Sequence, residues 1–568
     1  MIKHLHVDGV PTVLAPTSGP MHAGLAFRVG RADETLARGG ITHLIEHLVL
    51  HPLGMADYHF NGVTGSVWTY FHLQGSENDL ASFLTGVCDT LAALPMQRLT
   101  VEKEILRTEA AGRGSAVTDP LALWRHGARD YGLQGYPEWG LSACTPDDLL
   151  AWVAQYFTRD NAVLWIAGDA VPAGLNLRLP AGVRRPVPAP SSALPVTPAY
   201  FPGSSRAVAW DTVVPRSTTA SVFASVLERE MFRGLRQEAG LSYTVQTDYD
   251  PRGDGTAVIT AVADALPEKQ DAVLGGFVDV LAKMGVGRIE AADVKAVVAK
   301  RVEALDNAEA HAARLPAHAF NLLTGWPQQT ADELAAELRA VTPDDVARAA
   351  GTALRNGLLM TPDGRRAEWA GFAKAPSMSD AAVPGTTYRS LEVADVRMVV
   401  GDQGVSLVSG GEQLTVRFDA CSAMLAWPDG GRLLIGHDAV SLRVEPMLYA
   451  GLGAALPWID AAVGPDLRVD LPARDPEDIP RPDEAGTAAR RMQPTPSGGR
   501  GGAIALLVVL WPLLIVFGLL ALLFTVSSFI ESEERGLSIG VMLFSYLLGG
   551  LSLVGIVQAT GRLRRGAR

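Results

Sequence analysis

The sequence predicts an α+β protein: two related α/β sandwich halves, then a small β-barrel or sandwich domain, and finally a two-helix transmembrane hairpin. Three observations lead to this prediction. The four-residue motif TPDD occurs once in each half. A series of short strand-like runs follows the second half, and two long uncharged apolar stretches lie near the C-terminal end. A chain of 568 residues also exceeds one ordinary hydrophobic core, so several folded units are expected.

The two halves are predicted to span residues 1–170 and 199–365. Each closes with a helix that begins with TPDD, at Thr145 in the first half and at Thr342 in the second. Threonine is a good helix N-cap, and proline suits the first helical position. The shared phrase and the similar lengths indicate two related units. The Pro-rich stretch 171–198 between them is expected to be a linker.

Residues 376–465 are expected to form the small β domain. Six short runs, VRMVV, GVSLV, QLTVRF, SAMLAW, RLLIGH and AVSLRV, alternate with Gly/Asp turns, which is typical of a small barrel or sandwich. An apolar helix, PMLYAGLGAALPWIDAAV, is predicted to close the domain. The arrangement resembles pleckstrin-homology-like domains, and it leaves lipid binding, protein docking and a purely architectural role as alternatives. The Pro-rich stretch 466–502 is predicted to be a disordered linker.

Two stretches, 503–526 and 537–559, are uncharged and long enough to cross a bilayer as helices. Arginines flank the pair on both outer sides, whereas the short connection is mostly acidic. The positive-inside rule therefore places the N-terminal domains and the C-terminus in the cytoplasm, on a multi-pass protein of the inner cell membrane. The alternative is a pair of apolar helices in a soluble core. The opening run, MIKHLHVDGVPTVL, alternates like a strand and lacks the pattern of a secretory signal.

Charge and cysteine content exclude several classes of protein. The 61 acidic and 49 basic residues give a formal charge of −12. The protein therefore lacks a positive electrostatic field that would attract phosphate groups, and nucleic acid is not an expected partner. Cys88, Cys144 and Cys421 lie far apart in the chain. This spacing suits neither a disulfide framework nor a thiolate metal site, and it favours a reducing compartment.

A metal-binding pattern occurs in the stretch GGITHLIEHLVLHP, residues 39–52. On a helix, His43 and His47 stand at positions i and i+4 of one face, with the carboxylate of Glu46 beside them, and such a pair can hold zinc. Apolar residues fill the other positions and would bury the helix. The alternative is a core helix that carries histidines by chance.

A hydrolytic zinc site needs three protein ligands and one open position for water. The stretch TVEKEILRTEAAGRG offers Glu102 and Glu109 on one helical face, whereas Glu104 points away. We expect Glu109 to be the third ligand. Glu102 is expected to lie behind the ligands, where it would orient a zinc-binding histidine or tune the charge of the metal.

The inverted His-x-x-Glu-His pattern followed by a Glu-x6-Glu helix resembles the inverzincin zinc peptidases of the pitrilysin, insulysin and mitochondrial-processing-peptidase group. The resemblance covers residues 1–365. It extends to NGVTGSVWT, where Asn61, Thr64 and Thr69 keep the spacing of that group, and to LRQEAGLSY, which matches its Arg-x6-Tyr element with Arg236 and Tyr243.

This resemblance implies a zinc metalloendopeptidase with one Zn²⁺ per chain. His43, His47 and Glu109 would hold the metal, and Glu46 would be the general base. Asn61 and Thr64 would contact the peptide substrate. Arg236 and Tyr243 would bind the substrate and stabilise the transition state.

The same resemblance implies a partner, because two such halves make only half of a closed peptide chamber. A homodimer is therefore expected, with Arg236 and Tyr243 acting on the zinc of the other chain. A closed chamber selects short or unfolded peptides. The competing hypothesis is a catalytically silent member of the same fold, serving as a scaffold or a peptide-binding protein at the membrane. A second competing hypothesis places the function in the β domain and hairpin, with the peptidase-like part as a sensor.

Overall fold

The computed structural model describes residues 2–53, 59–113, 116–307 and 309–482. Both predicted membrane spans, 503–526 and 537–559, and most of the predicted linker 466–502 lie outside these residues. Within the part of the chain that the structure describes, no helix has the length and apolar character needed to cross a bilayer.

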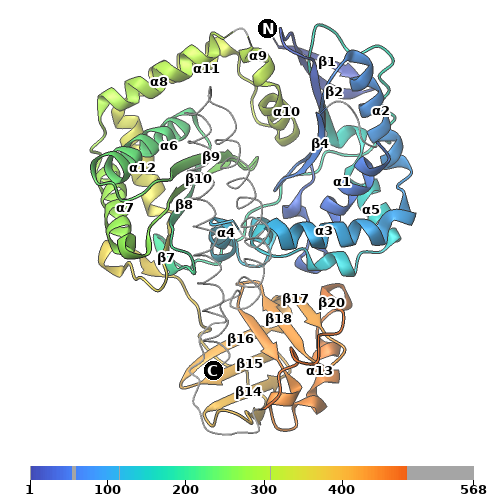
Figure 1. Ribbon diagram of the computed structural model, residues 1–568, viewed down its shortest axis with the longest axis vertical. Coiled ribbons are helices and arrows are strands. Elements are labelled where there is room, and N and C mark those ends of the chain that lie inside the picture. Colours follow the sequence, from blue (N-terminus) through green and yellow to red (C-terminus); the bar gives the residue numbers. More distant parts are fainter. Residues whose placement is uncertain (1, 54–58, 114–115, 308, 483–568) are drawn as a thin grey trace, which may run out of the picture. The chain divides into compact units, whose positions relative to one another are not determined.

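The first half is a six-stranded sheet with helices on one face (Figure 1). Its strand order is β1-β2-β6-β3-β5-β4, with β2 and β6 parallel and the other neighbours antiparallel. The strands are β1 (Lys3–Val7), β2 (Val10–Ala15), β3 (His22–Phe27), β4 (His59–Thr64), β5 (Thr69–Gln74) and β6 (Ala162–Ala167). The helices are α1 (Ile41–Leu50), α2 (Glu77–Ala92), α3 (Leu99–Arg113) and α5 (Pro146–Tyr156). They bury an apolar core against the sheet and leave β4 as its outer strand, next to α1.

The second half repeats this plan. Its strand order is β12-β7-β11-β8-β10-β9. Helices pack on one face of this sheet and enclose a second apolar core. The strands are β7 (Ala199–Pro202), β8 (Val208–Pro215), β9 (Val245–Pro251), β10 (Thr256–Ala263), β11 (Gly357–Thr361) and β12 (Ala373–Lys374). The helices are α6 (Thr218–Met231), α7 (Gln270–Gly285), α8 (Ala291–Leu305), α11 (Ala331–Ala340) and α12 (Pro343–Arg355).

The repeated TPDD phrase begins α5 and α12, as predicted. In both helices the threonine hydroxyl, of Thr145 or Thr342, accepts a hydrogen bond of 3.2 Å from the backbone N–H of the aspartate three residues later. The carboxylate of that aspartate accepts from the backbone N–H of the threonine, at 2.8 and 2.9 Å. These capping boxes satisfy N–H groups that the first turn leaves without partners.

Each half also gives a helix to the sheet of the other half. Helix α4 (Asp119–His126) packs on the second sheet, where Trp124 stacks on Phe201 with 4.8 Å between ring centroids. Helix α10 (Leu315–Thr324) packs on the first sheet with a row of buried apolar side chains. The face of each sheet that its own helices leave uncovered is therefore partly covered by the other half.

Residues 171–198 contain no helix or strand, which agrees with the prediction of a linker. They are nevertheless held against the protein. Leu177 and Leu179 are buried in the first core, and Arg184 donates hydrogen bonds to the carbonyl oxygens of Asp160 (2.7 Å) and Leu322 (2.8 Å). The segment is thus a fixed connection.

The β domain consists of two four-stranded sheets, ordered β13-β14-β15-β16 and β19-β18-β17-β20, around a third apolar core. Its strands are β13 (Thr386–Arg389), β14 (Val396–Gly401), β15 (Gly404–Ser409), β16 (Glu412–Arg417), β17 (Cys421–Ala426), β18 (Arg432–Gly436), β19 (Ser441–Val444) and β20 (Arg468–Asp470). The one α-helix of this domain among the described residues, α13, spans only Leu456–Ala462. The longer predicted helix is wrong because Gly451 has a φ of +75° and Pro457 starts a new helix.

The predicted start of the disordered linker at residue 466 is also wrong. Strand β20 pairs in parallel with β17. Further on, Arg474 donates hydrogen bonds of 2.8 Å to Asp429 and to Glu445, and its guanidinium lies 4.8 Å from the ring centroid of Trp427. These nonlocal contacts extend the folded domain to at least residue 474.

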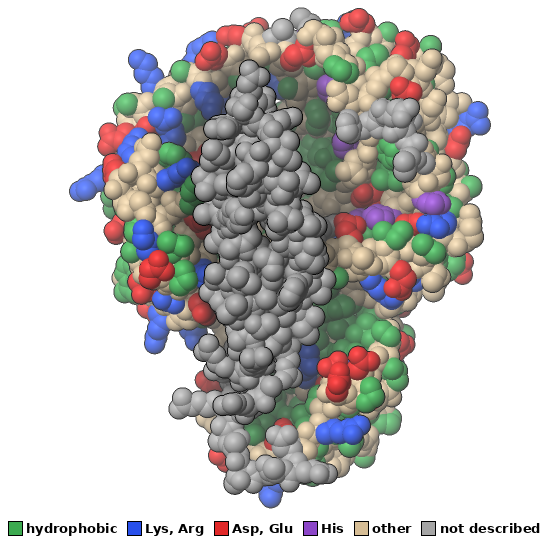
Figure 2. Space-filling model, in the orientation of Figure 1, with side chains coloured by type: hydrophobic (Ala, Val, Ile, Leu, Met, Phe, Trp, Pro, Cys, Tyr) green, Lys and Arg blue, Asp and Glu red, His purple; other side chains and the backbone are tan. Residues whose placement is uncertain are grey.

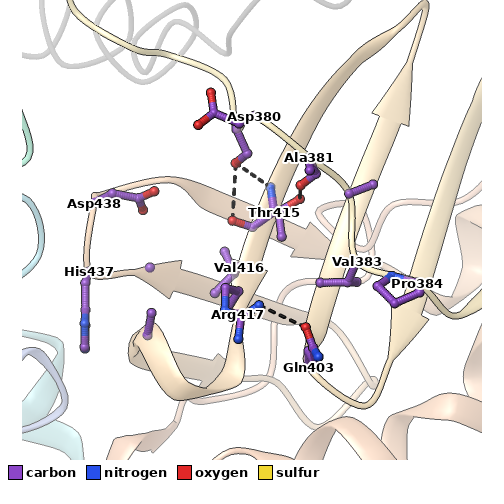
Figure 3. Close-up of a pocket in the computed structure, with 14 residues that line it drawn as sticks. Asp380, Ala381, Val383, Pro384, Gln403, Thr415, Val416, Arg417, His437 and Asp438 are labelled. Carbon is purple, nitrogen blue, oxygen red and sulfur yellow. Dashed lines mark hydrogen bonds between the residues drawn. The ribbon is translucent and has the colours of Figure 1, made fainter. Parts of the chain in front are cut away.

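A cavity of about 510 Å³ lies in the β domain between the segment before β13 and strand β16 (Figure 3). Several polar groups on its wall bond to one another. Thr415 donates its backbone N–H to Ser379 Oγ (2.9 Å) and its hydroxyl to the Ala381 carbonyl (2.8 Å), while Arg417 donates to Gln403 Oε1 (3.0 Å). Asp380, His437 and Asp438 also line the cavity.

The β domain packs against the first half along strand β17. Successive side chains of a strand point to opposite faces, so Ala423 and Leu425 join a buried cluster with Leu36 and Leu133, whereas Met424 enters the core of the β domain. The domain thus supports the chain segments that lead into α1. Cys88, Cys144 and Cys421 are buried free thiols.

Candidate metal centre

Helix α1 begins at a backbone position that suits glycine. Gly40 has a φ of +96° and offers no side-chain cap. The buried carboxylate of Glu34 takes that role and accepts hydrogen bonds from the backbone N–H groups of Gly40 (2.8 Å) and Thr42 (2.9 Å). Burial raises the pKa of Glu34. The start of the helix that carries the histidines is therefore fixed by one acidic side chain.

The structure brings His43, His47 and Glu109 together. One potential ligand atom from each lies within 4.8 Å of the other two. His47 Nε2 is 3.5 Å from Glu109 Oε2 on α3. Ligands about 2.0 to 2.1 Å from a tetrahedral zinc ion lie about 3.4 Å from one another, so a small inward movement of these side chains would match that geometry. Two imidazoles and one carboxylate are a donor set that suits zinc.

A polar cavity of about 590 Å³ surrounds these residues, and Figure 2 shows histidine and acidic side chains side by side on the surface over α1 and α3. Besides the three potential ligands, the side chains that line the cavity include Glu46, Asn61, Thr64, Arg31, Asp119 and Gln134. Space for a substrate and a water molecule therefore lies next to the potential ligands.

Glu46 is buried beside strand β4. The Thr64 hydroxyl donates a hydrogen bond of 2.5 Å to Glu46 Oε2. The strand passes so close that a β-carbon at Gly62 would lie 2.5 Å from Glu46 Cγ. Burial raises the pKa of Tyr70, and the Glu46 carboxylate adds to that shift. Strand β4 thus fixes the carboxylate in the wall of the cavity.

Each histidine presents its Nδ1 atom to a carboxylate behind it. His47 Nδ1 is 3.5 Å from Glu102 Oε2. His43 Nδ1 is 3.1 Å from Glu138 Oε1. Glu138 was missed in the sequence because it lies outside any motif, in the segment GYPEWG, and reaches the site only through the fold.

Other predicted residues lie elsewhere. The Thr69 hydroxyl donates to the Val29 carbonyl (2.9 Å), which is a bond inside the fold. Tyr243 is 75% exposed, and the Arg236 guanidinium lies 4.8 Å from its ring centroid. Arg236 and Tyr243 form a pair, but neither lines the cavity around His43. Their action across a dimer stays a prediction.

No protein-family model and no curated protein sequence matches the chain. Several solved structures do. A protease from Helicobacter pylori gives a TM-score of 0.54 at 16% identity, over 64% of this chain and 99% of that chain. An M16 peptidase domain from Pseudomonas fluorescens, described as inactive, gives 0.54 at 13%, over 66% and 100%. Over the two halves, the fold is that of M16 peptidase domains.

The periplasmic protease PqqL from Escherichia coli gives a TM-score of 0.52 at 12% identity, over 72% of this chain and 55% of that chain. These likenesses confirm the predicted fold of the two halves. An M16-like fold fits both a peptidase and a peptide-binding scaffold, since one of these similar structures is an inactive domain. The side chains of the candidate metal centre must decide between the two.

Proposed function

We propose that the protein is a zinc metalloendopeptidase that hydrolyses short or unfolded peptides, with one Zn²⁺ per chain. The observation that carries the proposal is the convergence of His43, His47 and Glu109 in a cavity that also holds the Glu46 carboxylate. Convergence from two separate helices is not required for packing. It is required for a shared metal ion.

When bound, zinc supplies Lewis acidity that polarises a peptide carbonyl and a water molecule. The carboxylate of Glu46 takes the proton of the attacking water and then gives it to the leaving amine. Thr64 holds one oxygen of that carboxylate in a fixed position. Glu102, which lies 3.5 Å from His47 Nδ1, would keep the imidazole of His47 in place.

The substrate would lie along strand β4, which forms the edge of the first sheet and carries Asn61 and Val63 in the cavity wall. An extended peptide can add to a sheet edge through main-chain hydrogen bonds. Such pairing places the scissile bond next to Glu46. It also excludes folded proteins, because their backbones are already paired.

A homodimer would complete the site with Arg236 and Tyr243 of the second chain. Mixing a Glu46→Gln chain with a Tyr243→Phe chain tests this. Partial recovery of peptide hydrolysis is expected, whereas no recovery would argue for action within one chain.

The apolar stretches 503–526 and 537–559 would anchor the peptidase on the cytoplasmic face of the inner membrane. Protease treatment of intact spheroplasts tests this orientation. The folded domains should be protected until the membrane is opened, and cleavage in intact spheroplasts would contradict it.

Peptide hydrolysis by the purified full-length chain tests the activity itself. His43→Ala should lose both zinc and turnover, whereas Glu46→Gln should keep zinc and lose turnover. Glu104→Gln is the matched control, because Glu104 is exposed on α3 and pairs with Arg107 away from the site. A wild-type chain without zinc and without turnover would favour the silent scaffold.

A further inference from the structure

One ring nitrogen of His43, Nδ1, lies against the carboxylate of Glu138. Glu138 approaches His43 Nδ1 with both oxygens, at 3.1 and 3.2 Å. An ionised carboxylate can only accept a hydrogen bond, so in the neutral imidazole Nδ1 carries the proton. In this tautomer the lone pair lies on Nε2, and Nε2 can then bind a metal.

Glu138 is itself fixed in place. Its side chain is 9% exposed and forms an ion pair with Arg31. The Arg31 backbone N–H donates to the Gly65 carbonyl (3.0 Å), which ties this arginine to the loop after β4. A β-carbon at Gly40 would lie 2.8 Å from Glu138 Cβ. The turn before α1 is therefore shaped to admit Glu138.

The other histidine has the same kind of support. Arg98 donates to Glu102 Oε1 (2.9 Å), and Glu102 Oε2 lies 3.5 Å from His47 Nδ1. Glu102 belongs to α3, whereas Glu138 precedes a 3-10 turn at Trp139–Ser142. Both imidazoles thus present Nδ1 to an arginine-backed carboxylate, and the two carboxylates come from separate elements.

We infer that Glu138, backed by Arg31, is the positioning residue of His43, an inference that rests on the proposed metal function. Carboxylates that accept the second N–H of a ligating histidine fix its tautomer and orientation, and their loss typically weakens metal binding by about 10-fold to 100-fold. Trp139, the next residue, packs in the cluster between the β domain and the first half. The β domain therefore helps to hold Glu138 at His43.

The first measurement is the zinc dissociation constant of the full-length chain, by competition with a chromogenic chelator. Glu138→Met keeps the length of the side chain and removes the acceptor, so binding about 10-fold to 100-fold weaker is expected. Glu138→Gln should recover part of the affinity, because its amide oxygen still accepts. Glu104→Met is the matched control and should bind like the wild type.

The second measurement needs no metal. Histidine ¹⁵N chemical shifts of the metal-free full-length chain at about pH 8, above the ordinary imidazole pKa of about 6.5, report which nitrogen of His43 is protonated. His43→Gln assigns the signals. The wild type should carry the proton on Nδ1, and Glu138→Met should give a mixture with the Nε2 form.

Unchanged Nδ1 protonation in Glu138→Met, or unchanged zinc affinity, would overturn the positioning role. If Glu138→Met fails to fold, Glu138→Gln and Arg31→Met provide the same comparison. A wild-type chain that binds no zinc, but whose His43 tautomer still depends on Glu138, would overturn the proposed function and leave the orientation of His43 by Glu138 intact. The two failures are therefore distinguishable.

Discussion

Gly62 lies directly against Glu46, so a larger residue at position 62 would displace the carboxylate. A β-carbon at position 62 would lie 2.5 Å from Glu46 Cγ and 2.7 Å from Glu46 Oε1. The strand reaches this distance while its Thr64 hydroxyl bonds to the same carboxylate. The position of the proposed base is therefore set by β4 as much as by α1.

Gly62→Ala should move Glu46 away from Thr64. A displacement of about 1 Å in a catalytic group can reduce turnover by about 100-fold, so we expect a large loss of peptide hydrolysis with zinc content unchanged. Gly112→Ala on α3 is the control, because a β-carbon there meets nothing within 4 Å. Full hydrolysis by Gly62→Ala would show that the close approach has no catalytic consequence.

Thr64→Val should remove the hydrogen bond to Glu46 while keeping the shape of the side chain. Hydrogen bonds to charged groups contribute about 1.5 to 3 kcal/mol, which corresponds to a turnover about 10-fold to 100-fold lower. Steady-state kinetics should show the change mainly in kcat. Thr108→Val is a control, since Thr108 is exposed and bonds to its own helix. Equal kcat values for wild type and Thr64→Val would contradict the role.

Glu34 predicts a pH dependence of stability. Burial raises its pKa above the ordinary 4.5, so the folded chain holds this proton more readily than the unfolded chain does. Protonation of Glu34 therefore contributes to the free energy of unfolding. This contribution is fully present below about pH 4.5 and is lost as the pH rises through the raised pKa. Glu34→Gln lacks this dependence. The difference in melting temperature between wild type and Glu34→Gln should therefore fall with rising pH, and a constant difference would contradict the assignment.

Leu425→Ser should loosen the β domain from the first half without changing the core of the β domain. Leu425 is 2% exposed in the shared cluster, and removal of a buried leucine destabilises by about 2 to 5 kcal/mol. A lower melting temperature is expected. Met447→Ser is the control, because Met447 is 51% exposed in the same domain.

The same packing bears on truncated chains. A chain ending at residue 375 would expose Leu36 and Leu133, which the β domain now covers. We expect such a chain to self-associate. A monodisperse, fully stable fragment in light scattering would show that the cluster contributes little.

Local sequence patterns were sufficient for the elements whose determinants are local. The spacing of His43 and His47 among apolar residues predicted helix α1. The spacing of Glu102 and Glu109 predicted which face of α3 lies against α1. Glu138 could not be predicted, because it reaches His43 from a separate turn across 95 positions of the chain. Strand β20 was missed for the same reason, since parallel pairing with β17 is not visible in either segment alone.

Local sequence patterns also could not predict what two glycine positions require of the fold. The sequence marks Gly62 as part of a strand, but the close approach of Glu46 depends on how α1 packs against β4. Gly451 and Pro457 interrupted a segment that was otherwise apolar enough for one helix. In both cases a backbone requirement outweighed the hydrophobic pattern.

The central claim is tested most directly by zinc K-edge X-ray absorption on the full-length chain reconstituted with zinc. The spectrum should contain two imidazole ligands and light oxygen ligands at about 2.0 to 2.1 Å, and Glu109→Gln should weaken or remove the bound metal. Sulfur scattering, a single imidazole, or an unchanged spectrum in Glu109→Gln would contradict the site formed by His43, His47 and Glu109.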